Sequence, residues 1–294
     1  MEIIRNNLLN LKNIALILGF FDGVHAGHRE VIKSAVSYAK TNSAKTALLT
    51  FKNSPAEYFK KPFNYIFPRE YSYKLLSELG VDYIIEKDFE DLVNISAHEF
   101  LESLIKTYSP ISISTGFNHT FGKNRQGNPN FLENFQENYN YKYFCAPEFK
   151  MENITVSSTN IKSFLSEGKI KEAYKFLTNN FSIKSKVISG DKIGRTIGFP
   201  TANLKYPNQI VKIPYGVYFA KVFDKPAVLN WGVKPTFDGK NEVLEVHILG
   251  FEGDLYGQEL NVEIIDKIRD EKKFKSVDEL KKQIKKDIEK CLKL

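Results

Sequence analysis

Hydrophobic residues follow one pattern in the first part of the chain and another after about Asn179, and this change constrains the fold more than any other feature. Before Asn179, short apolar runs alternate with stretches whose apolar residues recur at helical spacing. Such alternation is typical of a parallel β-sheet covered by α-helices, so we expect an α/β domain there. The expected strands are 14–18, 46–51, 81–85 and 111–114, and the expected helices are 28–40, 72–79, 97–108, 160–166 and 170–177.

After Asn179 the apolar runs are short and are separated by glycine and proline, which favours a small β-barrel. A last helix should follow, because Ser276 to Glu279 has the sequence of a capping box and an apolar stripe comes after it. We therefore expect two domains, 1–180 and 183–294. The expected strands are 185–188, 216–223, 227–231, 244–249 and 261–268.

Composition is that of a globular protein in water: 42% of the 294 residues are hydrophobic and 26% are charged. The formal net charge of +7 suits a protein that handles polyanions such as nucleotides, although the lysines of 272–293 fit a solvated helix face. Cys145 and Cys291 form no disulfide framework, so we expect a reducing, cytoplasmic compartment. We expect neither a signal peptide nor a membrane span, since no apolar run reaches roughly 18 residues.

The segment from Gly19 to Arg29 reads GFFDGVHAGHR and lies between an expected strand and an expected helix. Its two histidines, His25 and His28, would stand where the helix offers unpaired N–H groups and the positive end of its dipole. Imidazoles at that place can donate hydrogen bonds to phosphate oxygens as negative charge develops. Because a strand precedes the motif and a helix follows it, a site for attack on the α-phosphate of ATP is favoured over an ordinary turn.

This stretch resembles the HxGH signature of the nucleotidyltransferase superfamily, in its FAD synthetase branch. The resemblance implies a Rossmann-like nucleotidyltransferase domain that binds ATP and transfers AMP to the phosphate of FMN, releasing pyrophosphate. It also implies that His25 and His28 contact the phosphates as catalytic residues. Gly19, Asp22 and Gly27 would shape the turn that binds ATP.

Two further segments are similar to the same family. Residues 116–127, GFNHTFGKNRQG, resemble its flavin-side loop, where Asn118 and Thr120 would bind the flavin. Residues 157–162, SSTNIK, resemble its SSTxIR motif, in which Ser158, Thr159 and Lys162 would bind ATP.

Three positions depart from the family pattern. Lys162 stands where arginine is usual, which keeps the charge but loses the bidentate fork. His119 replaces an aromatic residue, and residues 51–55, FKNSP, replace an FDPHP-like run. The departures leave open how well this domain transfers AMP.

A second motif, residues 190–204, reads GDKIGRTIGFPTANL. Its glycines permit a backbone to approach a phosphate chain closely. Thr201 and Asn203, two apart on an extended run, point the same way and offer the oxygen ligands that Mg²⁺ prefers. The Walker A pattern is absent. Composition alone leaves a nucleotide-binding loop and a polar hairpin equally open.

The motif resembles the signature of the riboflavin kinase family, and the similarity extends over residues 183–294. It implies a six-stranded antiparallel β-barrel with a C-terminal helix, which transfers phosphate from ATP to the ribityl 5′-hydroxyl of riboflavin. Gly190, Lys192, Thr201 and Asn203 would bind ATP, with Thr201 and Asn203 also holding Mg²⁺; Glu245 would be the general base and Arg269 would lie near the flavin. Later segments that match are 213–218, 230–237, 244–249, 254–260 and 268–274.

Three interpretations from different classes remain. The leading one is a bifunctional enzyme that makes FMN and then FAD, with small-molecule partners, no nucleic acid and no membrane. The second is a riboflavin kinase whose first domain is weak or only binds nucleotide. The third is a nucleic-acid-binding protein, because HxGH also resembles class I aminoacyl-tRNA synthetases, although a KMSKS-like segment is absent.

Overall fold

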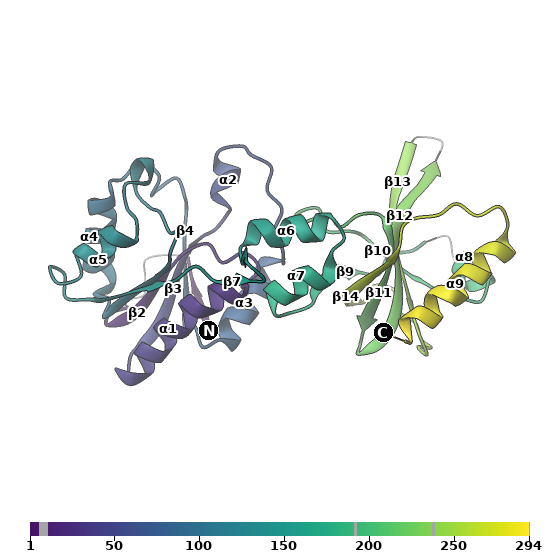
Figure 1. Cartoon of the computed structure of the whole chain (residues 1–294), viewed down its shortest axis with the longest axis horizontal. Helices are drawn as coiled ribbons and strands as arrows, with labels where there is room; N and C mark the ends of the chain where they lie inside the picture. Colours follow the sequence, from purple (N-terminus) through teal and green to yellow (C-terminus); the bar gives the residue numbers. More distant parts are fainter. Residues whose placement is uncertain (6–10, 191–192, 237–238, 294) are drawn as a thin grey trace. The chain divides into compact units, whose positions relative to one another are not determined.

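The computed structural model describes residues 1–5, 11–190, 193–236 and 239–293. The chain forms two compact units, Met1–Ser158 and Thr159–Leu294, which are described separately (Figure 1). The helices expected at 160–166 and 170–177 thus group with the second unit, while the domain boundary expected near residue 180 stays a prediction.

The first unit is built on a six-stranded parallel sheet with the order β1-β4-β3-β2-β5-β6. Its central strand, IALIL, is buried along its whole length, as expected for a strand covered on both faces. The four inner strands confirm those expected from the sequence. The strands are β1 (Glu2–Ile4), β2 (Ile14–Leu18), β3 (Lys45–Phe51), β4 (Tyr83–Lys87), β5 (Ser112–Gly116) and β6 (Lys142–Ala146).

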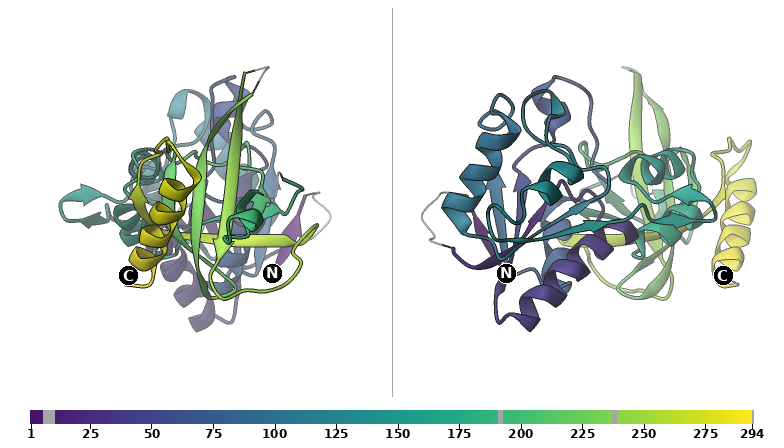
Figure 2. Two further views of the ribbon diagram at one scale, coloured as in Figure 1. Left: turned by 90° about the vertical axis from the view of Figure 1, so that its right-hand side faces the viewer. Right: turned by 60° about the vertical axis from the view of Figure 1, so that its left-hand side comes forward.

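Helices cover both faces of this sheet (Figures 1 and 2). Successive strand residues point to opposite faces, so Ile14, Leu16 and Leu18 meet one helical layer while Ala15 and Ile17 meet the other. The helices of this unit are α1 (Ala26–Thr41), α2 (Pro55–Tyr58), α3 (Arg69–Glu78), α4 (Ala97–Tyr108) and α5 (Pro129–Asn134), with a 3₁₀ turn η1 (Lys123–Arg125) and a small hairpin of β7 (Lys150–Met151) and β8 (Ile154–Thr155).

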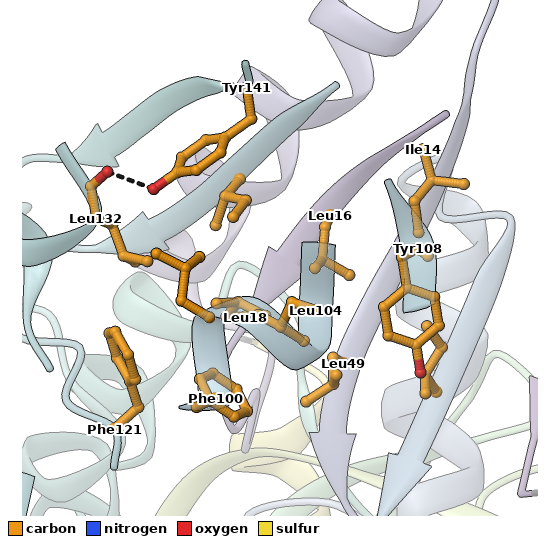
Figure 3. Packing of buried hydrophobic residues seen from close by; sticks show 14 of the residues in the cluster. Ile14, Leu16, Leu18, Leu49, Phe100, Leu104, Tyr108, Phe121, Leu132 and Tyr141 are labelled. Carbon is orange, nitrogen blue, oxygen red and sulfur yellow. Dashed lines mark hydrogen bonds between the residues drawn. The ribbon is translucent and has the colours of Figure 1, made fainter. Parts of the chain in front are cut away.

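Figure 3 shows the core between β2 and α4, where Leu16 and Leu18 pack among Phe100 and Leu104. Tyr141 closes one side of this core, and its hydroxyl donates a hydrogen bond of 2.5 Å to the carbonyl of Leu132. A close-packed core of this kind fixes the strand ends from which loops leave the sheet.

The strand order reverses at β2. The chain leaves β2 toward β3 on one side and later returns as β5 on the other side. In open α/β sheets, such a switch point opens a crevice at the carboxyl ends of the two strands, and ligands bind there. The turn 19–27 follows β2 and the loop 117–127 follows β5, so the fold brings both predicted segments to one crevice.

The second unit is built on a six-stranded antiparallel sheet with the order β10-β13-β12-β11-β14-β9. An isolated bridge joins Ile188, just past β9, to Asn203 in β10, so the two edge strands approach and the sheet curls toward a barrel. The elements are α6 (Ser158–Ser166), α7 (Ile170–Leu177), β9 (Phe181–Lys186), α8 (Ile193–Thr196), β10 (Ala202–Leu204), β11 (Gly216–Val222), β12 (Lys225–Thr236), β13 (Gly239–Ile248), β14 (Glu259–Arg269) and α9 (Val277–Cys291).

The C-terminal helix α9 forms as expected and packs on β12. Its first turn differs in one detail from the expected capping box. The Ser276 side chain accepts from the N–H of Glu279 at 3.2 Å, but the Glu279 carboxylate accepts from the N–H of Lys275 rather than Ser276. The stripe of the helix reaches Cys291, which is buried against Val217 and Val228.

Candidate active sites

The turn between β2 and α1 holds a strained backbone. Val24 is fully buried and has a φ of 44°, in the left-handed region that a β-branched residue rarely adopts. Gly23 precedes it at a φ of 84°, which only glycine adopts without cost. The carbonyl of Val24 accepts from Nε of Arg29 at 3.2 Å. Strain of this kind persists where the surrounding structure imposes it, and it gathers at functional sites.

His25 and His28 lie together at the start of α1. His25 is the N-cap residue, and its Nδ1 accepts from the backbone N–H of His28 at 3.3 Å. The two rings stack with centroids 3.6 Å apart and planes 16° apart. Because Nδ1 of His25 is an acceptor, the neutral ring carries its proton on Nε2, which can then donate to a ligand.

Both imidazoles are held neutral. Burial lowers the pKa of His25 to about 4. Burial, and then the neighbouring His25, lower the pKa of His28 well below its ordinary value. Nδ1 of His28 is buried and has no hydrogen-bond partner among the residues that the structure describes, which is typical of a site that a ligand completes.

Asp22 and Ser158 fasten this turn to its neighbours. The buried Asp22 carboxylate accepts a hydrogen bond from the N–H of Ile66 at 2.9 Å. The backbone carbonyl of Asp22 accepts one from the Ser158 hydroxyl at 2.8 Å. A Cβ atom on Gly27 would lie 3.4 Å from the His25 ring, and one on Gly19 would lie 2.9 Å from the Phe21 ring. The residues expected to shape the turn are therefore packed within it, and their contacts with ATP stay predictions.

The loop after β5 presents Asn118 and Thr120 to solvent, at the carboxyl end of the strand. Between them, burial lowers the pKa of His119 to about 4, and its Nε2 has no partner within the described part of the chain. A backbone β-bridge joins Phe121 to Gly127 across the loop. A Cβ atom added to Gly127 would lie 2.4 Å from the Phe121 ring. The loop geometry thus depends on that glycine. Thr159 and Lys162 lie in α6, which begins the second unit, so their place beside ATP stays a prediction.

A charged cluster beside this site was missed by the sequence reasoning. Glu86, buried at the end of β4, pairs with Arg5 and with Arg69, each at 2.7 Å, and accepts from the Tyr73 hydroxyl. Arg69 also donates to the carbonyl of Phe51 at the end of β3 and lines a small pocket that reaches Asp22. Arg69 and Tyr73 lie one turn apart on α3, but Arg5 and Glu86 are far from them and from each other in sequence, so only the arrangement of β1, β4 and α3 could reveal the cluster.

In the second unit, strand register places three of the predicted residues, Asn203, Glu245 and Arg269, in one row across five strands. Asn203 lies opposite Glu245, Glu245 opposite Asn230, Asn230 opposite Val217, and Val217 opposite Arg269. Residues directly opposite each other project from the same face of a sheet. A pocket of about 330 Å³ opens on this face and is lined by the last four of them.

The walls of this pocket differ in character. Val217 and Val228 from the barrel face Leu280 and Ile284 of α9, which gives an apolar slot. Glu245 and other polar side chains gather along the row already described. An apolar slot with a few convergent polar groups is the usual form of a small-molecule site.

Glu245 is held by a lysine that the sequence reasoning did not single out. Nζ of Lys234, on β12, lies 3.0 Å from Oε1 of Glu245, whose side chain is 20% exposed. Lys234 lies in the matching segment 230–237, but only the pairing of β12 with β13 brings it to the carboxylate.

Thr201 and Asn203 supply a hydroxyl and an amide oxygen beside the glycine-rich loop. A Cβ atom on Gly190 would lie 2.3 Å from Nδ2 of Asn203, so the loop backbone approaches that amide as closely as glycine permits. Thr201 lines the pocket that holds Glu245 and also a second pocket of about 250 Å³, formed with Arg195 and the loop 251–256. Lys192, expected to bind ATP, lies outside the described residues.

These oxygens fit a hard cation. In the part of the chain that the structure describes, no group of three His, Cys, Asp or Glu side chains is arranged to hold a metal ion. A cation at Thr201 and Asn203 would therefore take its other ligands from phosphate and water, as Mg²⁺ bound to a nucleotide does.

Arg269, expected near the flavin, also has a structural partner. Its guanidinium binds Asp287 of α9 through nitrogen–oxygen distances of 2.8 to 3.1 Å, and Asp287 is buried. Gln283 donates to the same carboxylate at 2.9 Å. Arg269 thus fastens the helical wall to the pocket it lines, and its contact with flavin stays a prediction.

Comparisons with known proteins match a different family to each part of the chain. A family model described as FAD synthetase matches residues 9–160, and one described as riboflavin kinase matches residues 177–294. Proteins named bifunctional riboflavin kinase/FMN adenylyltransferase are similar over nearly the whole chain. The one from Buchnera aphidicola (subsp. Schizaphis graminum) is 35% identical over 98% of this chain and 97% of its own, and the one from Escherichia coli K12 is 33% identical over 94% and 91%.

A crystal structure from Streptococcus pneumoniae, described as a macrolide-efflux protein, aligns with 98% of this chain and 97% of its own. Its identity to this chain is 30% and the TM-score is 0.88, so the two share their fold from end to end. The description as an efflux protein applies to the Streptococcus pneumoniae protein and is not carried over to this chain. Within the ranges described for this chain, no helix has both the length and the apolar character to cross a membrane.

Proposed function

The chain belongs to the family of bifunctional riboflavin kinase/FMN adenylyltransferases, and we propose how its residues divide the two reactions. It phosphorylates riboflavin with ATP to give FMN and ADP, and it then adenylylates FMN with ATP to give FAD and pyrophosphate. We assign the first reaction to the row of residues across β10 to β14 and the second to the crevice between β2 and β5.

For the kinase, the apolar slot between the barrel and α9 suits the flavin ring, and the second pocket suits the nucleoside of ATP. Thr201 lines both pockets, so the phosphates of ATP would meet the ribityl chain at that residue. The 5′-hydroxyl attacks the γ-phosphorus, its proton passes to Glu245, and ADP leaves.

Thr201 and Asn203 would hold Mg²⁺ together with the phosphates, and Gly190 lets the loop backbone pack directly against the Asn203 amide, which fixes the position of that amide. Mg²⁺ bound there would neutralise charge on the phosphate oxygens. The opposition of Asn203 and Glu245 is the observation that carries the kinase assignment, because it sets a metal ligand beside a base on one face.

For adenylyl transfer, the phosphate of FMN attacks the α-phosphorus of ATP and pyrophosphate leaves. FMN phosphate is already ionised, so this step needs no general base. The neutral imidazoles of His25 and His28 and the first N–H groups of α1 would donate to the α-phosphate oxygens as charge grows. Ser158, Thr159 and Lys162 would bind the remaining phosphates, and Asn118 and Thr120 would bind the flavin.

A crossed pair of variants tests this division. Glu245→Gln should abolish FMN formation from riboflavin but leave FAD formation from supplied FMN, whereas His28→Ala should do the reverse. Products are separated by chromatography after incubation with ATP and Mg²⁺, and circular dichroism checks that each variant is folded. Loss of both activities in one folded variant would refute the two-site assignment.

A second candidate has a weaker first site. Lys162 lacks the fork of the family's arginine, which supports a kinase whose first domain mainly binds nucleotide. FMN accumulating without FAD, even at high ATP, together with a rise in FAD output in Lys162→Arg, would favour this candidate. FAD formation by the wild type that does not change in Lys162→Arg would contradict this candidate.

The protein's partners are then its small-molecule substrates and products, with no nucleic acid among them. We place it in the cytoplasm, which is supported by two cysteines that form no disulfide, one exposed and one buried. Formation of FMN and FAD in a cytoplasmic extract, and their absence from other fractions, would test this placement.

A further inference from the structure

We infer that Asn230 recognises the ribityl chain of riboflavin and so selects flavins that carry a polyol. This inference rests on the proposed riboflavin pocket. Asn230 lies in β12, directly opposite Glu245 on one side and Val217 on the other, and its side chain lines the pocket. It is therefore a polar group set between the base and an apolar wall.

The side chain of Asn230 is half-buried, and its amide group forms no hydrogen bond with the described part of the chain. An amide carries two donors and an acceptor, and covering it without partners is unfavourable. When a flavin ring fills the apolar slot, water leaves this wall and the amide needs a new partner. Hydroxyl groups can both accept from it and donate to it, whereas the hydrocarbon side chain of a simple alkylflavin cannot.

The arrangement of Glu245 supports the same inference. Its Oε1 is bound to Lys234, so Oε2 is the oxygen left to face a substrate hydroxyl. Cβ atoms of directly opposite residues lie about 5 Å apart. That separation lets Glu245 receive the terminal hydroxyl while Asn230 binds the next hydroxyl along the chain. Asn230 would thereby fix which hydroxyl reaches the base.

The test measures FMN formation by wild type and Asn230→Ala, with lumiflavin as a competitive inhibitor. Lumiflavin has the same ring and carries a methyl group in place of the ribityl chain. The loss of one or two hydrogen bonds should raise KM for riboflavin by about tenfold, while the inhibition constant of lumiflavin stays unchanged. Asn261→Ala is the matched control, because Asn261 is exposed on β14 and should leave both constants unchanged.

Other outcomes overturn the inference. An unchanged KM means that Asn230 does not bind the substrate, and an equal rise in both constants means that it only shapes the pocket. A fall in kcat alone assigns it to the chemical step rather than to recognition. Leu280→Trp, which narrows the apolar slot, should raise both constants; if it raises neither, the pocket assignment itself is wrong.

Discussion

Lys234 and Glu245 form an ion pair across neighbouring strands, with Nζ of Lys234 3.0 Å from Oε1 of Glu245. The lysine side chain is 40% exposed and the glutamate side chain 20% exposed, so the pair contributes little to folding. It does restrict the carboxylate to one orientation. For a residue that takes a proton from an attacking hydroxyl, orientation matters more than the strength of the pair.

Replacing Lys234 by methionine should therefore lower kcat for FMN formation by about tenfold or more, because a base displaced by about 1 Å loses much of its effect. KM for riboflavin and the unfolding temperature should change little. Lys234→Arg keeps a charged donor and should restore most of kcat. A rise in KM that equals the fall in kcat/KM would instead make Lys234 a substrate ligand.

Gly190→Ala should remove kinase activity without harming the other site. The added methyl group would lie 2.3 Å from the Asn203 amide, which must then move away from Thr201 and from bound phosphate. We expect FMN formation to fall by about a hundredfold and to recover in part at high Mg²⁺. FAD formation from FMN is the internal control, and an unchanged rate of FMN formation would contradict the proposed role of Asn203.

The sequence was sufficient for the inner strands of the first sheet, because β2, β3 and β4 contain apolar runs that match the pattern of buried parallel strands. β5, with the sequence SISTG, is also buried although Ile113 is its one large apolar residue. The two outer strands, β1 and β6, were not predicted from the sequence, for physical reasons. β1 has only three residues, and β6, with the sequence KYFCA, mixes exposed and buried positions although four of its five residues are apolar. Edge strands carry weak patterns because one side of them meets solvent.

At the sites, motifs identified His25, Asn203 and Glu245, but not what surrounds them. The contacts of Lys234 and Asn230 with this site depend on strand register, which periodicity does not encode over a long separation. The stacking of the two histidines likewise depends on His25 being the N-cap, whereas the helix was expected to begin at His28.

Asp287→Ala should loosen the helical wall of the kinase pocket. Breaking a buried pair leaves the Arg269 guanidinium without its carboxylate, at a cost of about 3 kcal/mol of unfolding free energy. Because α9 carries Leu280 and Ile284, KM for riboflavin should also rise. Glu289→Ala, an exposed position on the same helix, is the control for both measurements. An unchanged unfolding temperature in Asp287→Ala would show that the pair does not anchor the helix.

The buried His25 should make stability depend on pH. Its pKa is about 4 in the folded protein, below its ordinary value of 6.5, because burial disfavours the charged ring. Between these two pKa values the imidazole binds a proton in the unfolded chain but not in the folded one. The free energy of unfolding is therefore full above pH 6.5 and falls as pH drops toward about 4. From about pH 7.5 to about pH 5 the loss from this residue should be about 2 kcal/mol.

His25→Asn keeps an N-cap acceptor but does not titrate, so urea unfolding at the two pH values should show a smaller loss in the variant. Equal losses in both proteins would mean that His25 is solvated and already titrates near its ordinary pKa.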